Sequence, residues 1–259
     1  MSTYVMSDIH GCYDDMLMMI EKIKLSDEDV LVFAGDYIDR GPKSYEMIKW
    51  IEKNLNNAIF LKGNHEVEFA YGISLMLEMC KKNEWSEESL EDTRIVFALI
   101  KQASQGVFDY YGTIQNLIEI HGCTLSELSH YANMFEDFPL FYLLEVSGRN
   151  YVIVHAGYID TLEGVDTERA YESIDEFYLY ARDDAYIYGG IEHGVVVAGH
   201  TPTTLEEELP FNNGDVYKSY DEDLDCTFYD IDCGCSAKGK RDGAKLACIR
   251  LNDEQIYYI

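Results

Sequence analysis

The chain begins, after three residues, with Tyr4-Val5-Met6-Ser7-Asp8-Ile9-His10-Gly11, in which a short apolar run leads directly into a polar cluster. The same order of apolar run and polar cluster returns at Val30–Gly41 and at Ala58–Glu66. Two intervening segments, Asp14–Lys24 and Lys43–Asn54, carry apolar residues at helical spacing. Strands that alternate with helices in this way predict a parallel sheet with right-handed crossovers.

Polar residues follow each predicted strand at the point where the strand ends. Ligands bind outside the carboxyl ends of the strands in open parallel sheets, so we expect these side chains to share one edge. Two later apolar runs, Tyr151–Val154 and Val195–Ala198, also end in or next to a histidine. The metal-competent residues at the five strand ends are Asp8 and His10, Asp36 and Asp39, Asn64 and His65, His155, and His200.

The middle of the chain changes to helical character from about Val67 to Phe138, and we interpret residues 67–138 as a helical insertion. A helix is expected over Glu168–Tyr180, and the strand pattern returns from Leu140 onward. No repeat or low-complexity linker is visible, so residues 1–259 are expected to form a single domain with a second sheet packed on the first. The candidate strands near the C-terminus are Asp215–Lys218, Thr227–Ile231, Lys245–Leu251 and Gln255–Ile259.

The composition limits the partners of the protein. The formal net charge is −28, whereas nucleic-acid and anionic-membrane surfaces need basic patches, so neither partner is expected. No stretch reaches the roughly 20 apolar residues of a membrane span, and the N-terminus lacks the pattern of a secretory signal. The seven cysteines form no C-x-x-C pair. These features predict a soluble, cytoplasmic protein.

The donor types at the strand ends indicate a particular class of metal site. Carboxylate, amide and imidazole donors together suit Mn²⁺, Fe²⁺ or Zn²⁺. Six of these residues are taken as the candidate ligands, and six ligands exceed what one catalytic ion needs if it keeps open positions. They are Asp8, His10, Asp36, Asn64, His155 and His200. Two ions roughly 3.5–4 Å apart, bridged by one carboxylate, fit that number better.

Five motifs follow one another along the chain: Asp8-Ile9-His10-Gly11, Gly35-Asp36-Tyr37-Ile38-Asp39-Arg40-Gly41, Gly63-Asn64-His65-Glu66, His155-Ala156-Gly157 and Gly199-His200-Thr201. In this order they resemble the signature of the phosphoprotein phosphatase (PPP) family of calcineurin-like metallophosphoesterases, above all its bacterial and phage branch. That branch includes enzymes similar to lambda phosphatase and the symmetrical diadenosine tetraphosphatases. The resemblance implies an α/β fold in which two packed mixed β-sheets are flanked by helices as an αββα sandwich.

The same resemblance implies a role for each site residue. It places Asp8 and His10 on the first metal and Asp36 as the bridge between two divalent ions, most readily Mn²⁺, with Fe or Zn as alternatives. His65 would be the general acid, oriented by Asp39. The residues implied for the second metal are Asn64, His155 and His200, and those implied to clamp the phosphate are Arg40 and Arg182.

Three functions follow from this interpretation. The first is a serine/threonine protein phosphatase that acts by direct attack of a metal-bridging hydroxide on phosphorus. The second is a symmetrical hydrolase of dinucleoside polyphosphates, which would need a purine pocket, for example from Tyr110, Tyr111 or Tyr158. The third is a non-catalytic binding module on the same fold. A phosphorylated protein or a small phosphoester is therefore the expected partner.

One segment matches the sequence motif of a different class of phosphatase. Cys235 and Arg241 have the C-x5-R spacing of cysteine-dependent phosphatases. In that class the thiolate sits in a loop that opens a helix, where backbone amides favour an anion. Here residues 239–243 read as a turn before a strand, so we interpret this match as a hairpin.

Overall fold

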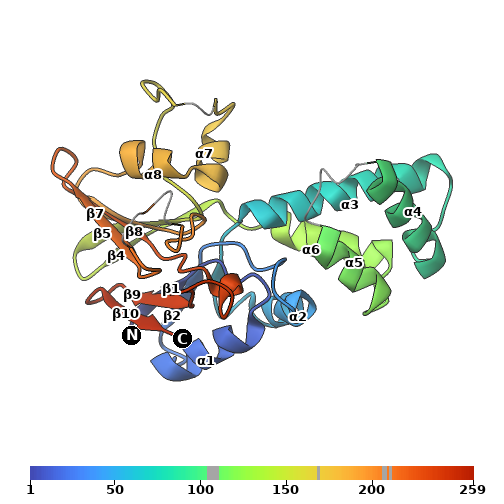
Figure 1. The fold of residues 1–259 in the computed structure, drawn as a ribbon, viewed down its shortest axis with the longest axis horizontal. Coiled ribbons are helices and arrows are strands. Elements are labelled where there is room, and N and C mark those ends of the chain that lie inside the picture. Colours follow the sequence, from blue (N-terminus) through green and yellow to red (C-terminus); the bar gives the residue numbers. More distant parts are fainter. Residues whose placement is uncertain (104–110, 168–169, 206–208, 210–211) are drawn as a thin grey trace.

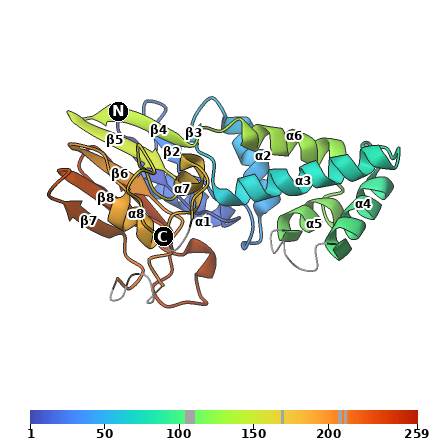
Figure 2. The same cartoon turned by 90° about the horizontal axis from the view of Figure 1, so that it is seen from above.

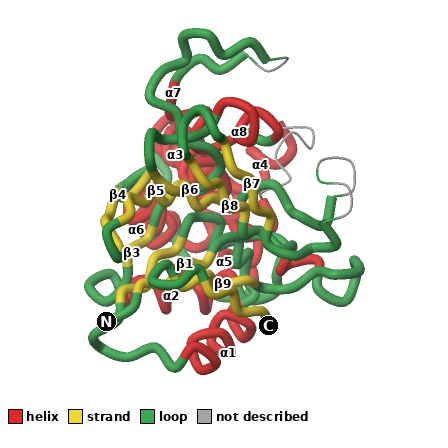
Figure 3. Tube along the Cα trace, turned by 90° about the vertical axis from the view of Figure 1, so that its left-hand side faces the viewer, coloured by secondary structure: helices red, strands yellow, loops and turns green. Residues whose placement is uncertain are grey.

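The computed structural model describes residues 1–103, 111–167, 170–205, 209 and 212–259. Its strands form two five-stranded sheets that lie face to face (Figure 3). The first sheet has the order β10-β9-β1-β2-β3, in which β1, β2 and β3 are parallel. Its strands are β1 (Thr3–Met6), β2 (Val30–Phe33), β3 (Ile59–Phe60), β9 (Ala247–Arg250) and β10 (Gln255–Tyr258).

The second sheet has the order β4-β5-β6-β8-β7. Its three central strands β5, β6 and β8 are parallel, and the two edge strands pair with them antiparallel. Both sheets are therefore mixed, as expected from the resemblance. The strands are β4 (Phe141–Val146), β5 (Arg149–Val154), β6 (Gly194–Ala198), β7 (Tyr217–Asp221) and β8 (Cys226–Asp230).

Alternating side chains divide the interior into separate layers. Val5 of β1 faces the core between the sheets, whereas its neighbours Tyr4 and Met6 face the helices on the outer side of the first sheet. The second sheet behaves in the same way, since Val197 faces the core between the sheets and Val196 packs under the outer helices. Side chains alternate between the two faces of a strand, so each sheet buries both faces. The result is the αββα sandwich.

Helices cover the outer faces of this sandwich (Figure 1). Helices α1 (Tyr13–Ile23) and α2 (Ser44–Asn54) lie against the first sheet, and the short helices α7 (Ile174–Tyr180) and α8 (Asp183–Tyr188) lie against the second. The N-terminal end of α7 is fixed locally, because Ser173 caps it by accepting a hydrogen bond from the backbone of Glu176.

The segment between β3 and β4 is helical and projects from one end of the sandwich (Figure 2). The first turn of α3 carries Asn64, His65 and Glu66 and is part of the strand-end cluster. We call the rest of the segment, residues 67–138, the helical arm. The arm has its own apolar interior, to which Phe97, Ile118 and Phe135 contribute, and this interior is continuous with the core under the first sheet. The helices are α3 (Asn64–Lys82), α4 (Leu90–Ala103), α5 (Tyr111–Glu119) and α6 (Leu125–Glu136).

Two sequence-based predictions about secondary structure were wrong. The predicted helix over residues 168–180 begins only at Ile174, and residues 168–169 lie outside the described part of the chain. The last two strands were expected in the second sheet, but they belong to the first. The reason is that β1 would otherwise have an unpaired edge, and β9 pairs with it antiparallel, with Val5 opposite Ile249.

Among the helices of the described residues, none combines the length and the apolar character that a membrane span requires.

Candidate active site

The structure brings the predicted metal ligands together at the carboxyl ends of the parallel strands. Asp8 and His10 follow β1, Asp36 follows β2, and Asn64 starts α3 just after β3. The second sheet contributes the histidines that follow β5 and β6. All six are buried: Asp8, His10, Asp36, Asn64, His155 and His200.

Much of the backbone at this site is held in the left-handed region, which side chains other than glycine rarely adopt. Asp8 has φ 53° and Asp36 has φ 56°. Such conformations cost on the order of 1–3 kcal/mol each, and they cluster where a surrounding structure must aim side chains at one point. The other non-glycine site residues with positive φ are His10, Asp39, Arg40 and His200.

Two glycines allow the site loops to approach one another closely. A Cβ on Gly63 would lie 2.3 Å from the backbone nitrogen of Asp36, and a Cβ on Gly199 would lie 2.1 Å from Asp8 Oδ2. Both distances are too short for non-bonded atoms. The glycine before Asn64 and the glycine before His200 are therefore required by packing at the site.

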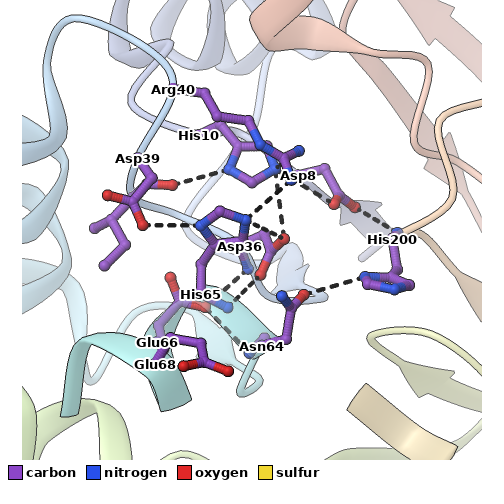
Figure 4. Close-up of polar contacts among 12 residues, drawn as sticks. Asp8, His10, Asp36, Asp39, Arg40, Asn64, His65, Glu66, Glu68 and His200 are labelled. Carbon is purple, nitrogen blue, oxygen red and sulfur yellow. Dashed lines mark hydrogen bonds and ion pairs between the residues drawn. The ribbon is translucent and has the colours of Figure 1, made fainter. Parts of the chain in front are cut away.

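Asp36 lies at the centre of the cluster (Figure 4). Its two carboxylate oxygens face different groups: Oδ2 lies 3.4 Å from His10 Nε2, and Oδ1 lies 3.5 Å from His155 Nε2. A carboxylate arranged in this way can bind one cation with each oxygen. The geometry therefore suits the bridging position that the sequence suggested for Asp36.

One set of donors converges on the Oδ1 side of Asp36. Asn64 Oδ1 lies 3.0 Å from His155 Nε2 and 3.1 Å from His200 Nδ1. The two imidazole nitrogens are 3.2 Å apart. The other ring nitrogen of His155 lies 2.9 Å from the backbone oxygen of Ala34, which orients the ring so that Nε2 faces the cluster.

A second set of donors lies on the Oδ2 side. His10 Nε2 is 3.8 Å from Asp8 Oδ1, and His10 Nδ1 is held 2.8 Å from the backbone oxygen of Ile38. Arg40 Nη1 lies 2.7 Å from His10 Nε2, so a positive charge already lies beside this nitrogen. A metal ion bound by His10 Nε2 would require the Arg40 side chain to move away from it.

His65 and Asp39 form the dyad expected from the sequence. His65 Nδ1 lies 2.8 Å from Asp39 Oδ2, and His65 Nε2 points to the cluster, 3.9 Å from Asp36 Oδ2. Burial lowers the pKa of His65, but the charge of Asp36 and the hydrogen bond with Asp39 outweigh it, and the net pKa lies above the ordinary value. Arg40 Nη2 lies 3.0 Å from the same Nε2 and can only donate a hydrogen bond, so Nε2 accepts in this arrangement. Nε2 can carry a proton toward the site only after the Arg40 side chain has moved away from it.

The electrostatics of the cluster fit divalent cations. Burial and the nearby charge of Asp36 raise the pKa of Asp8 to about 7, whereas burial lowers the pKa of His10 to about 3. Asp8 Oδ1 is buried and has no hydrogen-bond partner among the described residues. Neutral imidazoles and crowded carboxylates with an unsatisfied oxygen are what a cation would stabilise. The residues present therefore fit a metal centre.

Glu66 is a structural part of the site to which the sequence analysis assigned no role. Its carboxylate accepts hydrogen bonds from the backbone nitrogens of Asp36, at 2.9 Å, Tyr37, at 2.9 Å, and Gly63, at 3.1 Å. Burial and the charge of Asp36 raise its pKa to about 8. Glu66 thus joins the loop after β2 to the start of α3. Its position in the Gly-Asn-His-Glu motif was the only available signal.

Asp232 was missed, although the strand-end pattern could have found it. It follows β8, which runs parallel to β6 in the sheet that supplies His155 and His200. It is buried, and burial together with the charge of Asp8 raises its pKa well above the ordinary value. Its Oδ2 atom has no hydrogen-bond partner within the described ranges. Asp232 therefore adds a further carboxyl group behind the Asp8 side of the site.

The remaining predicted site residues are Arg182 and three tyrosines. Arg182 is half-buried at the start of α8, and its charge contributes to the lowered pKa of His200 after burial and His155. Tyr158 is buried and stacked on Tyr178, so it offers no open surface for a purine. Tyr110 and the side chain of Tyr111 lie outside the described residues.

A cavity of about 300 Å³ adjoins the site where Arg40 meets the helical arm. Its lining includes Asp39, Gly112, Thr113 and Asn116. A larger cavity of about 680 Å³ between α2, β3 and α6 contains none of the predicted ligands. The smaller cavity is the one that could receive a group attached to a phosphate bound at Arg40.

The family model of the calcineurin-like phosphoesterases matches residues 1–234. The chain belongs to the calcineurin-like phosphoesterase family. This result confirms the family predicted from the five motifs, and the two packed mixed sheets agree with it.

Sequence relatives of this calcineurin-like phosphoesterase include named tetraphosphatases. A symmetrical bis(5'-nucleosyl)-tetraphosphatase of Buchnera aphidicola subsp. Baizongia pistaciae is 41% identical over 68 residues, which cover 26% of this chain. The match spans only 24% of that relative's own length. An asymmetrical bis(5'-nucleosyl)-tetraphosphatase of Bacillus velezensis is 26% identical over 224 residues, covering 76% of each chain.

Solved structures agree with the fold of this phosphoesterase. A protein described as a candidate diadenosine tetraphosphatase has a TM-score of 0.54 at 16% identity, covering all of this chain and 92% of its own. A serine/threonine phosphatase of Saccharomyces cerevisiae has a TM-score of 0.53 at 14% identity, covering all of this chain and 79% of its own. At such low identity these matches show the fold alone.

Proposed function

We propose that the protein is a two-metal phosphoesterase that hydrolyses bis(5'-nucleosyl) tetraphosphates. The observation that carries the metal centre is Asp36, whose two carboxylate oxygens face two separate sets of nitrogen and oxygen donors. The substrate class rests on the relatives named as tetraphosphatases, one of which matches 76% of this chain. The relatives therefore favour the dinucleotide over the protein phosphatase that the motifs alone suggested.

The donor sets assign the residues that would hold the metals. Asp8 and His10 would bind the first ion, and Asp36 would bind both. Two bound divalent cations supply a nucleophilic hydroxide at neutral pH and neutralise part of the phosphate charge. The residues that would complete the second site are Asn64, His155 and His200.

The remaining site residues bind phosphate and handle protons. Arg40 reaches the cluster, and the charges of Arg182 and Arg40 both act on His200, so the two guanidinium groups can together hold phosphate oxygens. Once Arg40 has turned from His65 Nε2 to a bound phosphate, Nε2 can hold a proton and donate it to the leaving oxygen, while Asp39 fixes the ring. The polyphosphate chain beyond the cleaved bond can extend toward the cavity beside Arg40.

The test compares two substrate classes on one preparation. Purified protein is incubated with Mn²⁺ and either diadenosine tetraphosphate or a panel of phosphoserine and phosphothreonine peptides. We expect nucleotide release at a kcat/KM at least about tenfold above that for any peptide. The nucleotides identify the cleaved bond, since two ADP indicate symmetrical cleavage and ATP with AMP indicate asymmetrical cleavage.

Metal dependence is measured separately from turnover. A ligand that binds only the folded state at 100 times its Kd stabilises a protein by about 2.7 kcal/mol, so saturating Mn²⁺ should raise the melting temperature by several degrees. Rapid peptide dephosphorylation without nucleotide release would replace the proposed substrate with phosphoprotein. Absence of both activities, with no thermal shift on adding Mn²⁺, would refute the metal centre itself.

A further inference from the structure

The helical arm contacts the active site through Thr113, which lies in the first turn of α5. Thr113 is buried and lies 74 positions from Asp39 along the chain. Its hydroxyl donates a hydrogen bond to Asp39 Oδ1 at 2.5 Å, and its backbone N–H donates to the same oxygen at 3.3 Å. In return the backbone nitrogen of Asp39 donates to Thr113 Oγ1 at 3.0 Å. Three hydrogen bonds therefore join these two residues.

The two oxygens of Asp39 have different partners. Oδ2 faces His65 Nδ1 at 2.8 Å, whereas Oδ1 receives the two hydrogen bonds from Thr113. The first N–H groups of an α-helix have no partner within the helix, and its N-terminus favours a negative charge. The start of α5 thus holds the Asp39 carboxylate by one oxygen, which leaves the other oxygen aimed at His65.

The Asp39 backbone also needs an external support. Asp39 has φ 66° and the next residue, Arg40, has φ 63°, so two successive residues occupy the left-handed region. Asp39 N also lies 3.1 Å from the Ser44 hydroxyl, which itself lies 3.3 Å from Thr113 Oγ1. Ser44 belongs to the loop's own side of the site, so Thr113 is the contribution that comes from the arm.

We propose that Thr113 is a positioning residue: through Asp39 it fixes the ring of His65 so that Nε2 can protonate the leaving group. The proposal rests on the proposed function, because it assigns the proton donor of that reaction. It also gives the helical arm a role in catalysis. The described hydrogen bonds of Thr113 go to Asp39 and Ser44, and neither residue is a proposed metal ligand.

Leaving-group chemistry provides a test that separates positioning from simple support. Phenolate, the leaving group of phenyl phosphate, is more basic than p-nitrophenolate. Its departure therefore depends more strongly on a proton donor. Removing the Thr113 hydroxyl loses its bond to the Asp39 carboxylate, whereas Asp39 N keeps the Ser44 hydroxyl as an acceptor. The net loss of one hydrogen bond costs about 1–1.5 kcal/mol, which is about tenfold in rate. We therefore expect Thr113→Val, which keeps the shape, to lower kcat on phenyl phosphate about tenfold and on p-nitrophenyl phosphate less than about twofold, with KM unchanged. Thr113→Ser, which keeps the hydroxyl, should restore the rate.

A spectroscopic measurement on the metal-free protein is independent of turnover. The Nδ1 resonance of His65 is identified in ¹⁵N-histidine spectra by its absence from His65→Asn. We expect Thr113→Val to shift or broaden this resonance and Thr113→Ser to leave it in place.

Thr93→Val is the matched control. Thr93 is also a buried threonine of the arm, and its hydroxyl bonds the backbone of Ser89 and Leu125 instead of a site residue. This variant should destabilise the arm without changing the ratio of the rates on phenyl phosphate and p-nitrophenyl phosphate.

Equal losses on both substrates in Thr113→Val, or an unchanged His65 resonance, would overturn the inference while leaving the proposed function intact. A wild-type protein inactive on every phosphoester would instead remove the proposed function.

Discussion

The sandwich and the helical arm contribute to the site in different ways. The sandwich presents most of its chemical groups at the ends of parallel strands, where backbone geometry brings Asp8, Asp36 and His155 to one edge. The arm makes its contribution through a helix N-terminus that holds Asp39 from the side. In the sandwich, a residue belongs to the site because it lies at the carboxyl end of a strand. In the arm, Thr113 belongs to the site because α5 packs against the loop that carries Asp39.

The difference has an energetic basis. The strand-end residues are supported by two sheets and by Glu66, which accepts three backbone hydrogen bonds. The arm is held by its own apolar interior and by contact with the first sheet, and through Thr113 it contacts Asp39 of the proposed His65–Asp39 dyad. Substitutions in the sandwich site should therefore abolish chemistry, whereas substitutions in the arm should tune it.

The largest effect is expected for Asp36→Asn in the sandwich. The change removes a negative charge from the residue shared by both donor sets, so binding of either cation should weaken. We expect kcat to fall by at least about 10³-fold, equivalent to about 4 kcal/mol of lost transition-state stabilisation. Steady-state kinetics and calorimetric Mn²⁺ titration measure the two losses. Activity within tenfold of wild type would show that the two sets do not share Asp36.

The next effect concerns stability. Phe97 is 4% exposed in the arm, and Phe97→Ala should cost about 3–5 kcal/mol through the cavity that it leaves. If the arm opens separately from the sandwich, hydrogen exchange will accelerate in α4 and α5 but not in β5 and β6. Ile153→Ala, in the core between the sheets, is the comparison and should accelerate exchange in both regions. Identical exchange patterns in the two variants would mean that arm and sandwich unfold together.

A smaller effect is expected at the boundary between the two regions. Arg40 lies within 3.0 Å of His65 Nε2 and also lines the cavity shared with α5. A hydrogen bond to a charged group contributes about 1.5–3 kcal/mol, so Arg40→Ala should lower kcat/KM on diadenosine tetraphosphate by about 10–100-fold. Arg182→Ala should have a smaller effect, because Arg40 lies at hydrogen-bond distance from His10 and His65, whereas Arg182 acts on His200 through its charge. A larger loss in Arg182→Ala would reverse the assignment of the main clamp.

The smallest effect is expected for Cys235→Ser. Cys235 is a free, buried thiol in a short 3₁₀ turn, and it lies outside the donor sets of the proposed centre. Turnover should stay within about twofold of wild type, since the serine changes one buried atom at about 1 kcal/mol of stability. Abolished turnover together with unchanged Mn²⁺ binding would point to thiol chemistry instead of the proposed metal centre.

The sequence was most informative where function follows directly from local pattern. An apolar run ending in Asp, Asn or His identified the strand ends, and the parallel order of strands placed them on one edge before any coordinates were considered. The same rule would have found Asp232 after β8. It failed for the pairing of β9 with β1, because strand neighbours are chosen by the whole sheet and not by local sequence.

The sequence by itself determined the family, the order of the strand-end motifs and the donor types of the proposed centre. Each of these can be recognised within a segment of a few residues, without knowing how distant segments pack. Only the tertiary structure decided that Glu66 joins two site loops, that Asp36 divides its oxygens between two donor sets, and that Thr113 reaches Asp39 across 74 residues. Contacts between distant segments depend on how helices and sheets pack together. The hydrophobic pattern of the sequence predicts the helices and strands, but it does not predict which side chains their packing brings within hydrogen-bonding distance.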